Sequence, residues 1–128
     1  MSYTIDRVIE GADFEEVDKR TREALASQGF GVLTEIDVKA TMKKKIDKDM
    51  DDYRILGACN PHMAWEAMGL EPKVGSMLPC NVILRDVEGG VEVSAIDPLA
   101  SMAGIDNDEL KSVAGQVREM MEKVVAAV

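Results

Sequence analysis

Residues 30–42 alternate between apolar and polar side chains, and this pattern restricts the fold more than any other feature of the chain. Such alternation is typical of a β-strand that buries one face and leaves the other in water. A sheet built from strands of this kind is covered by helices on one face only. We therefore predict an α+β domain with a mostly antiparallel sheet of about five strands and helices packed on one face.

Residues 13–28 carry apolar side chains at the spacing of a helix. Asp13 precedes the apolar run and Glu16 follows three residues later, which is the pattern of a capping box. Gly29 suits the left-handed position just beyond a helix end. These signals together predict a helix over 13–28.

The longest predicted helix spans residues 106–128. Asp106 and Glu109 indicate a second capping box at its start. Apolar residues then recur at helical spacing and form one stripe that would face the core. The stripe consists of Leu110, Val113, Ala114, Val117, Met120, Met121, Val124 and Val128.

Shorter elements fill the rest of the chain. Strands are predicted at 3–10 and 53–59, and the charged stretch 43–52 between strands has room for a short helix. Asn60, followed directly by proline, predicts the start of a helix over 60–68, because asparagine caps helices and proline fits their first position.

Residues 80–87 and 91–96 predict a β-hairpin around Gly89-Gly90, since glycine permits the tight turn. The complete order is strand, helix, strand, strand, helix, strand, strand, helix (βαββαββα). A chain of 128 residues is the usual size of one domain, so we expect a single domain over 1–128.

The net charge of −9 restricts the classes of partner. A field of this sign repels phosphate backbones and anionic lipids, so we expect no binding to nucleic acid or membranes. The run Lys43-Lys44-Lys45 is followed at once by aspartates, which is typical of a solvated turn. This sequence contains no recognisable signal peptide and no apolar run long enough to span a membrane, so we expect a cytoplasmic protein. Because the cytoplasm is reducing, we expect its two cysteines to be free thiols.

Three motifs occur in order along the chain: YRILGACNP at 53–61, LPCNV at 78–82 and VEVSAIDP at 91–98. Together they resemble the family known as domain of unknown function 302, over nearly the whole chain. The resemblance implies a small prokaryotic α+β domain with a helix-covered sheet, often a dimer. The family has no agreed activity, so the resemblance implies no catalytic residue, although Cys59 and Cys80 match its two cysteine motifs.

Cys59 ends a predicted strand directly before a predicted helix. The positive end of a helix dipole favours the thiolate, which is the reactive and metal-binding form of cysteine. His62 lies in the first turn of the same helix. If Glu88 pairs with Val91 in the hairpin, then Cys80 and Asp97 are diagonal neighbours on one sheet face.

The pairing of the strands at 53–59 and 80–87 decides whether these residues meet. An antiparallel pair brings six candidate residues to one edge of the sheet, whereas a parallel crossover separates the two cysteines. The candidate ligand-binding residues are Cys59, Asn60, His62, Cys80, Asn81 and Asp97. Met63, Met68, Met77 and Met102 are assigned to packing, although cysteine and methionine together also suit soft ions such as copper(I).

Three functions are compatible with these residues. The favoured hypothesis is a module that binds a small molecule or a soft metal ion near Cys59 and Cys80. The second is a thiol-based redox or sulfur-transfer enzyme. The third is a structural or interaction module that forms a homodimer through the polar sheet face or Trp65. The sequence identifies no particular cofactor and no catalytic group.

Overall fold

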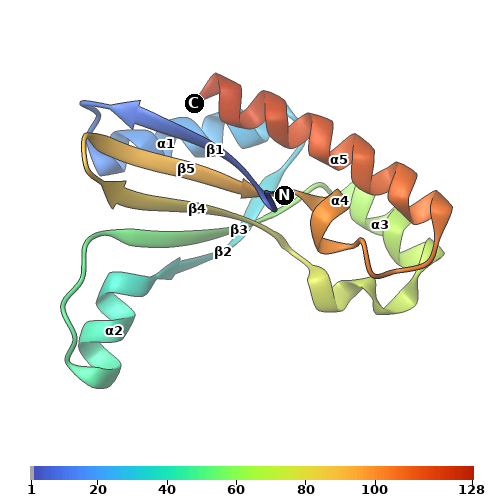
Figure 1. Cartoon of the computed structure of the whole chain (residues 1–128), viewed down its shortest axis with the longest axis horizontal. Helices are drawn as coiled ribbons and strands as arrows, with labels where there is room; N and C mark the ends of the chain where they lie inside the picture. Colours follow the sequence, from blue (N-terminus) through green and yellow to red (C-terminus); the bar gives the residue numbers. More distant parts are fainter. Residues whose placement is uncertain (1) are drawn as a thin grey trace.

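The structure, a computed structural model, describes residues 2–128 and contains a five-stranded antiparallel sheet (Figure 1). The strands lie in the order β1-β5-β4-β3-β2, and every neighbouring pair is antiparallel. This arrangement confirms the predicted α+β class and the antiparallel sheet. The strands are β1 (Thr4–Glu10), β2 (Gly31–Asp37), β3 (Tyr53–Cys59), β4 (Cys80–Val87) and β5 (Gly90–Ile96).

Helices cover one face of the sheet. The two long helices, α1 (Phe14–Ser27) and α5 (Asp108–Ala127), pack against each other and enclose the main core with the inward side chains of the central strands. The shorter helices are α2 (Val38–Ile46), α3 (Pro61–Leu70), α4 (Pro98–Ser101) and a 3-10 helix, η1 (Pro72–Met77). None of the helices within residues 2–128 has the length and apolarity needed to cross a membrane.

The predicted start of α1 is confirmed in detail. The Asp13 carboxylate accepts a hydrogen bond from the backbone N–H of Glu16, and Gly29 adopts a φ of +81° just beyond the helix. The start of α3 is also as predicted, because the Asn60 side chain accepts from the N–H of Met63. The helix continues to Leu70, so the predicted end near residue 68 was slightly early.

The predicted cap of α5 was wrong by one residue. Asn107, and not Asp106, caps the helix by accepting from the backbone N–H of Leu110 at 3.0 Å. Asn107 can also donate, and its Nδ2 bonds the carbonyl oxygen of Leu70 at 3.0 Å. A carboxylate lacks that donor, which explains why the amide occupies this position.

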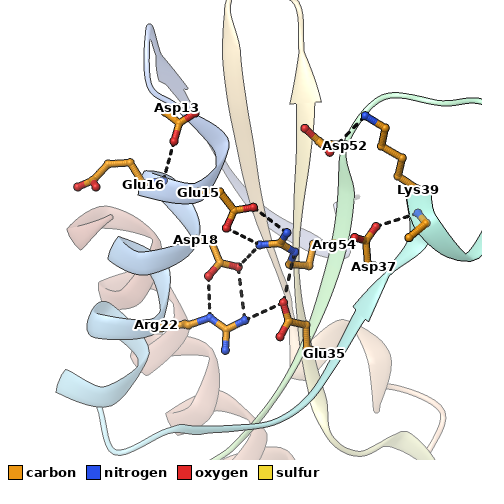
Figure 2. A network of polar contacts seen from close by, with 11 residues as sticks. Asp13, Glu15, Glu16, Asp18, Arg22, Glu35, Asp37, Lys39, Asp52 and Arg54 are labelled. Carbon is orange, nitrogen blue, oxygen red and sulfur yellow. Dashed lines mark hydrogen bonds and ion pairs between the residues drawn. The ribbon is translucent and has the colours of Figure 1, made fainter.

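The prediction of one strand over 30–42 was wrong in its second half. β2 ends at Asp37, whose side chain accepts from the N–H of Ala40 and starts α2 (Figure 2). The lysines that follow are good helix formers, and Thr41 bonds back to the carbonyl of Asp37. β2 lies at the edge of the sheet and is mostly exposed, whereas the alternation predicted a strand with one buried face. Residues 38–42, predicted as its second half, belong to α2. The element order is therefore βαβαβα, then η1, ββ and two helices.

The hairpin of β4 and β5 is present, but its predicted register was wrong by two residues. Val87 pairs with Gly90, so the turn consists of Glu88 and Gly89, and Gly89 has a φ of +89°. Gly90 is the first residue of β5. A Cβ at this position would lie 2.2 Å from the carbonyl oxygen of Ile9 on β1. A glycine is therefore required inside β5 for the close approach of β1.

Candidate functional site

The two cysteines lie at the same end of the sheet. β3 and β4 are antiparallel, and Ala58 is the register partner of Cys80. Cys59 is the next residue along β3, so it lies beside the start of β4. Of the two pairings that the sequence left open, the structure has the one that brings the cysteines together.

Both cysteines line one narrow cavity of about 40 Å³ between α3, α5 and the ends of β3 and β4. It lies where the main core meets a second, smaller core cluster formed by α3, η1 and the start of α5. Asn60 is the one polar side chain, apart from the thiols, among the described residues that line it. The lining consists of Phe30, Ala58, Cys59, Asn60, Met63, Ala64, Ala67, Leu78, Pro79, Cys80, Pro98, Met102, Leu110, Val113, Ala114 and Val117.

The two thiols differ in their surroundings. Cys59 is half-buried, whereas Cys80 is only 8% exposed. Burial, with a further contribution from the nearby Cys59, raises the pKa of the Cys80 thiol to about 11. Cys80 is therefore protonated at neutral pH unless a cation replaces its proton.

Two thioether sulfurs share the cavity with the thiols. Met63 comes from the first turns of α3, and Met102 follows α4. The sequence offers no signal that separates these two methionines from Met68 and Met77, which do not line the cavity. The wall therefore contains four sulfur atoms from four separate segments.

Asn60 fixes the wall of the cavity at the start of α3. Besides capping the helix, its Nδ2 donates to the carbonyl oxygen of Gln28 at 3.2 Å and lies 3.8 Å from the sulfur of Met120. The segment that carries Cys59 is thereby tied to the end of α1. Asn60 is one of the predicted site residues, and its polar atoms are used in these structural contacts.

The other three predicted site residues do not line the cavity. His62 is exposed on α3, and Asn81 lies on the opposite, uncovered face of the sheet, because neighbouring strand residues point to opposite sides. Asp97 is buried, but its carboxylate accepts from the backbone N–H of Leu99 and from Arg118 Nε, both at 2.9 Å. Of the six candidate residues, Cys59, Asn60 and Cys80 therefore line the same cavity, and His62, Asn81 and Asp97 do not.

A cluster of five charged side chains, which no sequence pattern predicted, lies between α1 and the edge of the sheet (Figure 2). Arg54 on β3 contacts Glu15 at 2.8 Å and Asp18 at 2.9 Å. Arg22 contacts Asp18 at 2.7 Å and Glu35 on β2 at 3.2 Å. These ion pairs fasten α1 to the two outermost strands at that edge.

The charges in this cluster compensate one another. Burial alone would raise the pKa of Asp18, but hydrogen bonds from Arg22 and Arg54 outweigh it and lower that pKa below its usual range. The Arg54 guanidinium also lies 5.0 Å from the centre of the Phe14 ring, where it gains a cation–π contact. Because each charge is paired, the cluster is a structural feature rather than an open binding site.

A conventional metal centre would need several charged or imidazole ligands. Within residues 2–128, no group of three or more histidine, cysteine, aspartate and glutamate side chains is arranged to hold a metal ion. The sulfur-lined cavity offers a different donor set, two thiols and two thioethers, which is the kind preferred by soft ions.

Comparisons with known proteins agree with this fold. The crystal structure of an uncharacterized conserved DUF302 protein from Bacillus stearothermophilus is similar, with a TM-score of 0.92 and 21% sequence identity over 99% of this chain and 98% of that chain. Among curated proteins, none matches the sequence. Residues 5–128 match the family described as domain of unknown function DUF302. The chain, whose motifs predicted this relationship, therefore belongs to the DUF302 family.

Proposed function

We propose that the protein binds a soft, monovalent metal ion, copper(I), in the cavity between Cys59 and Cys80. The single observation that carries this proposal is that two thiols from adjacent strands and the thioethers of Met63 and Met102 line the same narrow, almost entirely apolar cavity. Thiolate and thioether ligands select copper(I) over harder ions.

The size of the cavity favours an ion over an organic molecule. Its volume of about 40 Å³ has room for a bare ion or a very few water molecules. Pockets that hold drug-sized ligands have volumes of roughly 300–1,000 Å³. Of the two occupants that the sequence suggested for this site, the metal ion therefore fits better.

The charge balance also favours a monovalent ion. A copper(I) ion bound by one thiolate and by neutral sulfur atoms has no net charge, so it can enter an apolar cavity without a large desolvation cost. Cys59 is the better candidate for that thiolate, because burial disfavours the anion of Cys80. Binding would release a proton, so the affinity should fall as the pH falls.

The raised pKa of Cys80 weighs against the second hypothesis, a thiol enzyme that uses this residue as its nucleophile. At neutral pH a thiol with a pKa of about 11 is almost entirely in the unreactive protonated form. A redox or sulfur-transfer role would then depend on Cys59 alone, and no neighbouring base in the cavity lining is available to activate it among the described residues.

We also propose that the protein works in the cytoplasm. Cytoplasmic glutathione and thioredoxin keep thiols reduced. Reduced thiols are the form of Cys59 and Cys80 that this site would need for copper(I).

An anaerobic competition titration tests the proposal. The reduced protein competes with a chromogenic copper(I) chelator, and the wild type is compared with Cys59→Ser, Cys80→Ser and the double variant. We expect the wild type to remove one copper(I) from the chelator, each single variant to bind more weakly, and the double variant to lose binding. Competition by the double variant at wild-type strength would refute the proposal.

Two further variants make the test specific. His62→Ala removes an exposed potential ligand that does not line the cavity, so it should bind copper(I) like the wild type. Met63→Leu keeps the shape of an apolar side chain but removes one thioether, so it should weaken binding less than either serine variant. Denaturant unfolding of every variant shows whether a loss of binding reflects a loss of folding.

A further inference from the structure

The sheet face opposite the helices contains a hollow of about 500 Å³, lined by side chains of β1, β3, β4 and β5. Pockets that hold small organic molecules have volumes of roughly 300–1,000 Å³, so this hollow is of a suitable size. It lies on the other side of the sheet from the sulfur-lined cavity and shares no lining residue with it. What binds here is therefore independent of copper binding.

A row of register partners crosses the hollow from a charged end to an apolar end. Asp6 on β1 pairs with Ser94 on β5, and Ser94 pairs with Ile83 on β4. Because neighbouring strands lie about 4.8 Å apart, the row is roughly 10 Å long between the first and last Cα atoms. A ligand with one charged end and a short apolar body would match this order of side chains.

Ser94 is the most deeply buried of the residues that line the hollow. It is only 4% exposed, although it points to the face that the helices leave uncovered. Its hydroxyl contacts Glu92 Oε1 at 3.4 Å, which is longer than the usual O–H···O distance of about 2.5–3.0 Å. A hydroxyl this buried normally has a closer partner, which a polar group of a ligand would supply.

The charges that line the hollow favour a cation. Arg85 and Glu92 compensate each other, because Nε and Nη2 of the arginine both lie 2.9 Å from Glu92 Oε1. Asp6 forms no ion pair with any of residues 2–128, so its carboxylate is the uncompensated charge. The chain as a whole has a net charge of −9, which attracts cations and repels anions.

The remaining lining suits an apolar body attached to that cation. Ile83 and Ile96 are half-buried on the floor of the hollow, and Tyr53 and Tyr3 also line it. Tyrosine rings pack against apolar ligand surfaces and also attract cations through their faces. An inorganic cation would use neither the isoleucines nor the tyrosines, and a neutral molecule would leave Asp6 without a partner.

We infer that this hollow binds a primary organic ammonium ion with a short alkyl or aryl body. The ammonium group donates to the Asp6 carboxylate and to the Ser94 hydroxyl oxygen. The apolar body lies over Ile83 and Ile96. The site adds a second ligand, of a different chemical class, to the copper(I) proposed for the other side of the sheet.

An NMR titration of the isotope-labelled full chain with phenethylammonium tests the inference. Two probes of the same shape serve as comparisons, the neutral phenethyl alcohol and the anionic phenylpropionate. We expect phenethylammonium to cause saturable shifts of the backbone amides around Asp6, Ser94 and Ile83. The alcohol should bind about fivefold more weakly because it lacks the ion pair, and phenylpropionate should cause no saturable shift.

Two variants with the same net charge separate the ion pair from general attraction. Asp6→Asn should raise the dissociation constant of phenethylammonium about fivefold and leave that of the alcohol unchanged. Glu88→Gln removes one negative charge at an exposed turn that does not line the hollow, so it should bind phenethylammonium like the wild type. Asp6 is exposed, so its replacement should not change the urea unfolding midpoint.

A third variant tests the apolar part of the site. Ile83→Thr keeps a β-branched side chain suited to a strand but removes apolar surface from the floor of the hollow. It should weaken phenethylammonium and phenethyl alcohol to a similar degree. Equal binding of both probes by Ile83→Thr and the wild type would contradict the proposed position of the apolar body.

Three other results would overturn the inference. The first is the absence of saturable shifts with phenethylammonium. The second is an equal loss of affinity in Asp6→Asn and Glu88→Gln, which would show attraction to the acidic chain rather than to this site. The third is an affinity that falls as the protein concentration is raised, which would assign the hollow to contact with another copy of the chain. Copper(I) competition by Asp6→Asn should match the wild type, since Asp6 does not line the sulfur-lined cavity.

Discussion

Ala58 and Cys80 lie directly opposite each other on the antiparallel strands β3 and β4. This pairing brings two cysteines, 21 positions apart in the sequence, to one apolar cavity. The cavity leaves Cys59 half-buried and Cys80 buried. The reactivity of the two thiols should therefore differ, and their difference can be measured without knowing the ligand.

Alkylation of the native protein across a range of pH should resolve the two thiols. We expect Cys59 to react first and Cys80 to react with an apparent pKa of about 11. In the Cys59→Ser variant the pKa of Cys80 should fall, because the neighbouring thiolate no longer opposes its ionisation. Mass spectrometry assigns each modified residue. Rapid alkylation of Cys80 at neutral pH in the folded protein would contradict this account of its burial.

Replacement of Asn60 by alanine should destabilise the domain more than a typical cap mutation. The variant loses the hydrogen bond to the N–H of Met63 and the bond from Nδ2 to the carbonyl of Gln28. Loss of a cap costs about 1 kcal/mol, and a carbonyl left without its partner adds about 1 kcal/mol more. Urea denaturation measures the change. Asn81→Ala, at an exposed position, is the control and should change the stability by less than about 0.5 kcal/mol.

Local signals in the sequence predicted the parts of the fold that depend on near neighbours. The caps at Asp13 and Asn60 involve contacts within a few residues, so their patterns are readable without tertiary structure. The hairpin was also predicted between the correct strands, although its register was wrong by two residues. The prediction for 30–42 was wrong because alternation alone does not distinguish a strand from a short solvated helix. In the structure, Asp37 caps α2 and so marks the end of the strand. In the sequence, however, an aspartate within an alternating run also fits the polar face of a strand.

The sequence predicted the two cysteines of the candidate site, but it did not determine the strand pairing that brings them together. Cys59 and Cys80 meet because β3 and β4 are antiparallel, which the sequence left open. His62, Asn81 and Asp97 were included because they lie near the cysteines in sequence or register, but side-chain direction separates them in the structure. The ion cluster around Arg54 joins residues from α1, β2 and β3. Contacts between residues so far apart in the sequence are not indicated by any local pattern.

Two glycine substitutions should have opposite effects on stability. Alanine at Gly90 places a Cβ 2.2 Å from the carbonyl oxygen of Ile9, so the pairing of β1 with β5 must shift. Overpacking of this kind costs about 1–3 kcal/mol. Gly115 lies within α5, where an added Cβ has only an ordinary 3.9 Å contact with Leu99. Gly115→Ala should therefore stabilise the protein by roughly 0.5–1 kcal/mol.

Thermal and urea unfolding of both glycine variants measure these changes. If Gly90→Ala were as stable as the wild type, the close approach of β1 to β5 would be wrong. If Gly115→Ala were destabilising, α5 would be packed more tightly at this position than the contact distance indicates.

Replacement of Asp18 by asparagine should make the free energy of unfolding less dependent on pH in the acidic range. The pKa of Asp18 is lowered in the folded protein, despite its burial, by Arg22 and Arg54. A carboxylate with a lowered folded-state pKa stabilises the protein fully above its unfolded pKa of about 3.9. That contribution is lost as the pH falls through the folded-state value.

We therefore expect Asp18→Asn to reduce the free energy of unfolding by about 1–3 kcal/mol at neutral pH, because Arg22 and Arg54 lose a charged partner. The difference from the wild type should shrink below about pH 4, where the wild-type carboxylate is itself protonated. Asp51→Asn, at an exposed aspartate, is the control and should show little difference at either pH. A difference between Asp18→Asn and the wild type that stays constant from neutral pH to pH 3 would mean that the side chain acts through packing, and that the charged network does not hold α1 against the sheet.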